Sequence, residues 1–186
     1  MLALEDVLPH DAPTTTTDAL AYFDALSAVQ PESMIGTWHG TELPTGHPLD
    51  GLLSVSGWWG KAFVDAETVH PLLFPTSDGR ALWPLNPVLG FAGLGASTRI
   101  PALRNRNLAG VISRLAPVLR ARGPKARLRT TRYRGVDSAT MIYDQLPIND
   151  VFHRVDDETV LGAMDLRGIS RPYFFVLRRD DSLPVR

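Results

Sequence analysis

The spacing of apolar residues predicts three helices along the first two thirds of the chain. Residues 18–29 place Leu20 and other apolar side chains at helical spacing, and Pro31 ends that helix because proline disfavours helical geometry in the residue before it. A shorter helix is predicted over 49–59, and a third over 107–122, where Pro117 should introduce a kink or an early end. The apolar face of the third helix comprises Leu108, Val111, Ile112, Leu115 and Leu119.

Short runs with β-type patterns predict strands, and most of them lie in the last third of the chain. Residues 59–63 fit neither a helical nor a strand pattern clearly. Five closely spaced late strands with tight turns predict a meander, which tends to close into a barrel or a sandwich. The predicted strands are 35–43, 69–74, 81–85, 126–134, 139–143, 151–155, 159–165 and 173–179.

Glycine and proline divide the remaining sequence. Residues 86–101 are expected to form a long connection, in which Gly90, Gly93 and Gly95 make a flexible lip that gates a cavity. Residues 1–17 are predicted to be a mobile leader, ending in a threonine run that can cap the first helix.

These elements predict a mostly β, α+β fold, an antiparallel β-barrel with two or three flanking helices over residues 18–186. The run Tyr173–Leu177 is apolar on both faces, so one face is expected toward a barrel interior and the other under a helix. A homodimer that pairs along this strand stays open at this stage.

Composition narrows the classes of function. The chain has 186 residues, a net charge of −1 and no cysteine. This balance lacks the basic character of a nucleic-acid binder, and the lack of cysteine excludes disulfides, thiolate catalysis and cysteine-ligated metals. The first residues lack the pattern of a signal peptide and no apolar run is long enough to span a bilayer, so we expect a cytoplasmic protein without membrane insertion.

A glycine-flanked tryptophan motif, Gly-Thr-Trp-His-Gly at 36–40, is followed by further motifs at 45–51, 57–61 and 69–72. Together they resemble the GXWXG domain family, which is named for the pentapeptide. The C-terminal part resembles the domain of unknown function that usually follows it. Its matching residues are 133–135, 143–144, 147–148, Asp150, 155–162, 164–165 and 173–179.

The resemblance implies a GXWXG part at about 18–85 and a C-terminal part at about 125–180 within one domain. The Gly-x-Trp element also resembles the opening strand of lipocalins and of haem-binding nitrobindin barrels, which implies a lipocalin-like barrel. Trp38 would then plug the closed end, and an arginine of the last strand, Arg178 or Arg179, would stack on it by a cation–π contact.

Three polar residues near these motifs are candidate catalytic groups. His47 can exchange a proton near neutral pH, and Lys61 beside a carboxylate such as Asp50 can orient an anion or a carbonyl. The alternative is local, with His47 capping the turn at Pro48 and Asp50 capping the following helix.

A cavity in such a barrel would be mostly apolar, with a few placed polar groups. Asp150 buried in this interior would be costly unless paired, so its burial would indicate a role. The alternative for Asp150 is a cap on an ordinary hairpin, and for His70 it is a turn histidine. The residues expected to bind a ligand are Trp58, Phe63, His70, Leu72, Met141, Tyr143, Met164 and Phe175.

We expect binding of an apolar small molecule, such as a lipid, an isoprenoid or an aromatic metabolite, without a cofactor. One alternative is a cofactor-independent acid–base enzyme, an isomerase, hydratase, cyclase or hydrolase, acting on a hydrophobic substrate. A second is a haem-binding barrel that uses His153, which shares a strand face with Val151 and Val155. The five histidines show no metal-binding spacing, so no metal site is predicted.

Overall fold

The computed structural model describes residues 15–97 and 108–186, and its strands form one antiparallel sheet. The strands are β1 (Ser27–Ala28), β2 (Gly36–Leu43), β3 (Gly60–Phe63), β4 (Val69–Pro75), β5 (Leu82–Pro84), β6 (Ala126–Tyr133), β7 (Val136–Tyr143), β8 (Ile148–Arg154), β9 (Thr159–Leu166) and β10 (Tyr173–Arg179). The α-helices are α2 (Thr16–Ala25), α3 (Leu52–Ser56), α4 (Pro87–Ser97), α5 (Ala109–Arg114) and α6 (Ala116–Leu119), and a 3₁₀ turn covers Pro31–Met34.

Eight strands close into a ring, in the order β8-β7-β6-β4-β3-β2-β10-β9, with β9 pairing back to β8. The predicted barrel and its five late strands are therefore confirmed. β1 and β5 pair with β8 and β4 outside this ring. β10 pairs with β2 on one side and β9 on the other, which corrects the idea that its edge is available to a dimer partner.

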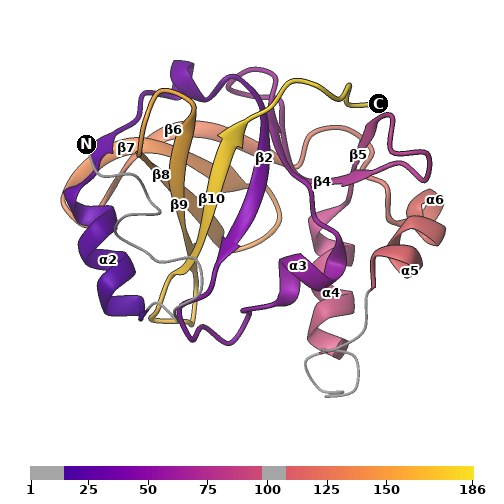
Figure 1. The fold of residues 1–186 in the computed structure, drawn as a ribbon, viewed down its shortest axis with the longest axis horizontal. Helices are drawn as coiled ribbons and strands as arrows, with labels where there is room; N and C mark the ends of the chain where they lie inside the picture. The colour runs from indigo at the N-terminus through magenta and orange to yellow at the C-terminus, as the bar shows by residue number, and fades with distance from the viewer. Residues whose placement is uncertain (1–14, 98–107) are drawn as a thin grey trace.

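The helices gather on two sides of the barrel (Figure 1). α2 lies against the outer wall on one side, while α3, α4, α5 and α6 lie together on the other. Within the described residues five α-helices flank the barrel, where the sequence predicts two or three. As predicted, Pro117 divides the third helix: α5 ends at Arg114 and α6 begins at Ala116.

The expected long connection at 86–101 was wrong for its first part, since residues 87–97 form α4, and residues 98–101 lie outside the described residues. Pro87 is the first helical residue, where its fixed φ and missing N–H are tolerated. The Asn86 side chain accepts a hydrogen bond from the Val88 N–H at 3.1 Å, which caps the helix. Gly90 and its neighbouring glycines lie inside this helix and not in a flexible lip.

α2 begins with the predicted threonine cap, because the Thr15 hydroxyl accepts from the Asp18 N–H at 3.1 Å. Residues 15–17 therefore belong to a capped helix and not to a leader; residues 1–14 of that expectation lie outside the described residues. The helix ends at Ala25 because the next residues turn extended and pair with β8 as β1.

α3 is shorter than the predicted 49–59, because Gly57 ends it in the left-handed conformation with φ +77°. The ambiguous segment after it becomes β3. There, a Cβ on Gly60 would lie 1.9 Å from the Trp38 carbonyl oxygen, so only glycine allows this approach of β3 to β2.

Apolar side chains fill two layers separated by the barrel wall. The inner layer holds Trp38 and Phe152, and the outer layer holds Phe23 of α2 with Val151. β10 contributes to both, as its sequence predicts. Tyr173, Phe175 and Leu177 face the inner layer, and Phe174 and Val176 face the outer one.

Trp38 is almost fully buried in the inner layer, and its indole N–H donates to the Met34 carbonyl at 2.8 Å. The stacking arginine is Arg179, whose guanidinium carbon lies 4.4 Å from the Trp38 ring centroid. Arg178 is exposed instead, since neighbouring residues of a strand point to opposite sides of the sheet.

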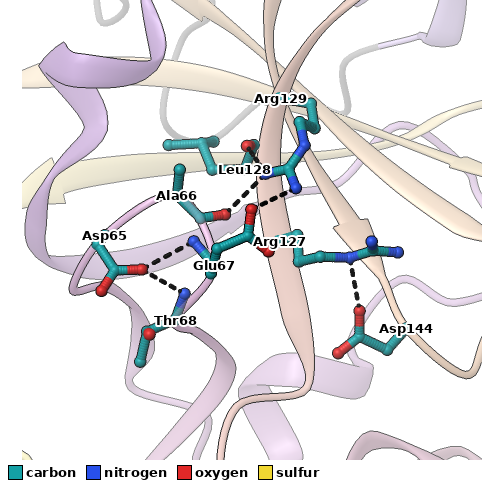
Figure 2. Close-up of polar contacts among 8 residues, drawn as sticks. All are labelled: Asp65, Ala66, Glu67, Thr68, Arg127, Leu128, Arg129 and Asp144. Carbon is teal, nitrogen blue, oxygen red and sulfur yellow. Dashed lines mark hydrogen bonds and ion pairs between the residues drawn. The ribbon is translucent and has the colours of Figure 1, made fainter.

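The shortest strand pairing of the ring joins β4 and β6, where Val69 and Ala126 form the one paired position. Figure 2 shows how side chains support this seam. Arg129 of β6 donates to the Ala66 carbonyl at 3.0 Å and pairs with Glu67 at 2.5 Å, both in the turn before β4. Charged contacts from a turn thus supplement a short strand ladder.

Candidate functional site

A cavity of about 380 Å³ lies between the barrel interior and the helices α3 to α6. Its walls are almost entirely aliphatic and aromatic. The barrel contributes Trp58, Lys61, Leu72, Phe74, Leu85, Tyr143, Asp150, Met164, Tyr173 and Phe175. The helical side contributes Leu49, Leu52, Leu53, Ser56, Leu89, Gly90, Phe91, Leu108, Val111, Ile112, Leu115 and Leu119.

Two opposite charges stand in this apolar wall. Lys61 Nζ lies 2.8 Å from Asp150 Oδ2, and the two side chains are only 3% and 1% exposed. The ammonium also donates to the Pro71 carbonyl at 3.2 Å. It lies 4.9 Å from the Phe175 ring centroid and 5.5 Å from that of Trp58, so aromatic faces complete its surroundings.

Burial sets the protonation behaviour of this cluster. It raises the pKa of Asp150, while the positive charge and hydrogen bond of Lys61 partly oppose that rise. Burial, together with the negative charge of Asp150, raises the pKa of Tyr143 well above its usual value. Burial likewise raises the pKa of Tyr173, with the carboxylate of Glu42 adding to the effect.

Two polar atoms of the cavity-lining residues lack a hydrogen-bond partner among the described residues. They are Asp150 Oδ1 and Trp58 Nε1, and both are buried. A buried polar group that is left without a partner costs about 1–3 kcal/mol, so each of these atoms calls for an explanation. Here they lie within one cavity wall, beside the ion pair.

Six of the residues predicted to bind a ligand or to act in catalysis meet in this cavity: Trp58, Lys61, Leu72, Tyr143, Met164 and Phe175. Phe63 and Met141 pack in the barrel core away from it. His70 sits on β4, outside the lining set, and its pKa is lowered by burial.

The expected trio of His47, Asp50 and Lys61 does not form. Asp50 accepts from the backbone N–H groups of Thr45 and His47 at 3.0 and 2.9 Å, which places its carboxylate in the turn before α3. His47 Nδ1 accepts from the Leu49 N–H at 3.1 Å, again a local contact. Among the described residues the ion-pair partner of Lys61 is Asp150 and not Asp50.

His47 is nevertheless close to the cavity wall. Its ring meets that of Tyr173 edge-on at 5.4 Å between centroids, and Tyr173 lines the cavity. Burial lowers the pKa of His47, which keeps its imidazole neutral at neutral pH. His47 therefore packs on a cavity-lining residue without lining the cavity itself.

His153 lies on the outer side of the barrel, on the same strand face as Val151 and Val155, and not in the interior where it could hold a haem. Its ring stacks on Phe23 at 3.9 Å, and its Nδ1 donates to the Phe23 carbonyl at 2.7 Å. The side chain is buried under α2 and is not part of the cavity wall. This placement gives the haem hypothesis no support.

Much of the cavity wall was not predicted to bind a ligand, and Tyr173 and the third predicted helix show why. Tyr173 was treated only as part of a strand, although its position two residues before Phe175 puts both on one face. The apolar face of 107–122 was recognised, but its destination, the cavity, was not. A helix with so wide an apolar face must pack against another apolar surface, and this requirement could have indicated that the helix covers the barrel interior.

The described residues contain no group of three or more His, Cys, Asp or Glu side chains that could hold a metal ion. None of their helices is long and apolar enough to cross a membrane.

Comparison with known proteins places the chain among relatives. Residues 21–79 match the GXWXG protein family, and residues 124–179 match DUF4334, a domain of unknown function. No curated protein matches the sequence. A crystal structure of a protein from Thermomonospora curvata is 32% identical, covers 88% of this chain and 86% of its own, and superposes with a TM-score of 0.65. The chain belongs to the family of GXWXG proteins that also carry a DUF4334 domain.

Proposed function

We propose that this protein binds an apolar small molecule, such as a lipid, an isoprenoid or an aromatic metabolite, inside the barrel cavity. The observation that carries the proposal is an apolar cavity of about 380 Å³ with a buried Lys61–Asp150 pair in its wall. Ligand sites typically enclose about 300–1,000 Å³ and combine apolar walls with few polar groups. Holding such a guest within a barrel would be lipocalin-like.

The polar side chains favour a guest with one neutral polar group. The ion pair has no net charge, so a charged head group would meet either Lys61 or Asp150 unfavourably. Trp58 Nε1 can only donate a hydrogen bond and ionised Asp150 Oδ1 can only accept one. A hydroxyl group on the guest both donates and accepts, so it suits either kind of atom.

Displacement of a neutral fluorescent probe, N-phenyl-1-naphthylamine, tests this proposal. We expect the probe to bind and 1-decanol to displace it at lower concentration than decanoate or decylammonium. Leu53→Trp places a ring in the cavity wall and should abolish binding. The matched control is Val64→Trp on the exposed turn after β3, which should leave binding unchanged. Equal binding by both variants, or none by the parent chain, would contradict the proposal.

A second candidate function is acid–base catalysis on a hydrophobic carbonyl compound. The raised pKa of Asp150 and its unpartnered Oδ1 favour this carboxylate as the base, in place of His47 or Asp50. Tyr143 and Lys61 would stabilise the developing oxyanion; a positioned base contributes about 10²–10⁴-fold. Deuterium exchange into an apolar ketone in D₂O, followed by NMR, tests it. Exchange should exceed that of buffer and be lost in Asp150→Asn.

A further inference from the structure

The cavity reaches the molecular surface between α4 and α5. Leu89, Val111 and Leu115 belong to the cavity wall, yet they are 40%, 51% and 48% exposed. Val88 and Val118 extend this apolar rim, and Val118 is 72% exposed. Of the seven large apolar side chains that are exposed in the described residues, four therefore lie on α4, α5 and α6, and Leu115 lies between α5 and α6. We call this surface the mouth face.

The sequence around the mouth face carries positive charge without negative charge. Residues 79–136 contain twelve of the nineteen basic residues of the chain and none of its twenty acidic residues. Arg114 ends α5, and Arg122 and Lys125 follow α6. These three make no ion pair within the described ranges, 15–97 and 108–186.

The arginines of β6 are different, because each of them has a carboxylate partner. Arg127, Arg129, Arg132 and Arg134 pair with Asp144, Glu67, Asp137 and Asp24. Basic residues without such partners therefore lie at the end of α5 and just after α6, next in sequence to the exposed apolar rim. Apolar side chains next to uncompensated arginines are what the surface of an anionic bilayer attracts, through its acyl chains and its phosphates respectively.

We propose that the mouth face docks on an anionic phospholipid surface, so that the cavity opens toward the bilayer. Figure 1 shows α4, α5 and α6 together at the end of the molecule away from α2. A second copy of the chain fits this face less well, because a symmetric dimer would bring arginines against arginines. The passage of a ligand between the bilayer and the cavity rests on the proposed function, whereas the docking of the protein on the bilayer does not.

Co-sedimentation with sucrose-loaded vesicles, without added ligand, tests docking on the full chain. We expect sedimentation with phosphatidylglycerol/phosphatidylcholine vesicles, much less with phosphatidylcholine alone, and a decrease as salt rises. Each removed charge should weaken partitioning about fivefold, so Arg114→Gln/Arg122→Gln should lose roughly 25-fold. Val118→Ser should weaken it as well, and its exposed position leaves folding intact.

Arg132→Gln/Arg134→Gln is the matched control. It removes the same charge from the strand end beside α2, and should leave sedimentation unchanged. Equal loss in both double variants, equal binding to neutral vesicles, or no sedimentation overturns the proposal. So does a dimer in analytical ultracentrifugation that Val118→Ser dissociates, since the face would then serve self-association. Vesicle binding without probe binding would leave docking standing and contradict only the cavity function.

Discussion

Lys61 and Asp150 come from β3 and β8, strands on opposite sides of the eight-strand ring, and their 2.8 Å ion pair crosses the barrel interior. Four strand-to-strand steps separate β3 from β8 in either direction around the ring. Desolvation of two charges often outweighs their attraction, so apolar residues of similar volume would hold the barrel at least as well. The pair therefore points to a role in recognition or chemistry.

Removing one member of this pair should destabilise the protein more than removing both. Lys61→Met leaves Asp150 buried without a partner, and we expect a loss of about 3–5 kcal/mol in the free energy of unfolding. Lys61→Met/Asp150→Leu should recover most of that loss. Urea denaturation measures both. A double variant as unstable as Lys61→Met would mean that the charges themselves are needed for stability.

Gly40 should be intolerant of a side chain, because Trp58 packs directly on it. A Cβ at this position would lie 2.0 Å from the Trp58 ring. We expect Gly40→Ala to displace the indole, to lower stability by about 1–3 kcal/mol and to weaken binding of the fluorescent probe.

Gly110→Ala is the control for this substitution. It lies in α5, where a Cβ would meet open space, and alanine favours a helix over glycine. Stability should stay equal or rise slightly. Unchanged probe binding in Gly40→Ala would show that the position of Trp58 does not matter for the ligand.

The buried His153 should make stability fall in mild acid. Burial lowers its pKa from the ordinary value of 6.5. Below that value the unfolded chain binds a proton that the folded chain does not, so stability present above about pH 6.5 is lost as the pH falls toward the folded-state pKa.

The readout is the drop in unfolding free energy between about pH 7.5 and about pH 5.5. His153→Phe should show a smaller drop than the parent chain, even if its stability at neutral pH is lower. His47 and His70, whose pKa values burial also lowers, account for part of the remainder. An unchanged slope in His153→Phe would contradict the expectation.

Arg179 should not be replaceable by lysine. Its guanidinium stacks on Trp38 and donates to the carbonyls of Ile35 and Ser33 at 2.7 and 2.8 Å. A lysine keeps the charge but loses this planar fork, so Arg179→Lys should lower the unfolding free energy by about 1–3 kcal/mol. Arg178→Lys, on the exposed side of the same strand, should change it by less than about 0.5 kcal/mol.

The sequence predicts the β elements well because their period and turn signals are local. The five late strands lie within a few residues of their expected bounds, and the barrel follows from them. The α4 helix was missed because glycine and proline indicate a loop, whereas its place against the cavity is a tertiary effect. Pro87 beside Asn86 was the local sign that a helix could begin there.

The site was harder to predict, because its key contact joins residues that are distant in sequence. Lys61 was assigned to Asp50, which is near in sequence, yet its partner lies on the opposite side of the ring. Strand register decides this, and a single sequence does not reveal it. Asp150 itself was recognisable, since an inward carboxylate needs a partner. Arg179 and Arg178 differ only by the face on which they fall, which also depends on register.

The two family segments pair with each other at two places in the ring, β4 with β6 and β2 with β10, and neither segment closes the ring alone. The GXWXG segment, 21–79, supplies β2, β3 and β4 of the ring, and the DUF4334 segment, 124–179, supplies β6 to β10. The cation of the cavity comes from the first and the anion from the second, while α4 to α6, between the segments, wall it on one side. The two segments are therefore two halves of one ring, and a chain that lost either half would be left with an open sheet and unpaired strand edges.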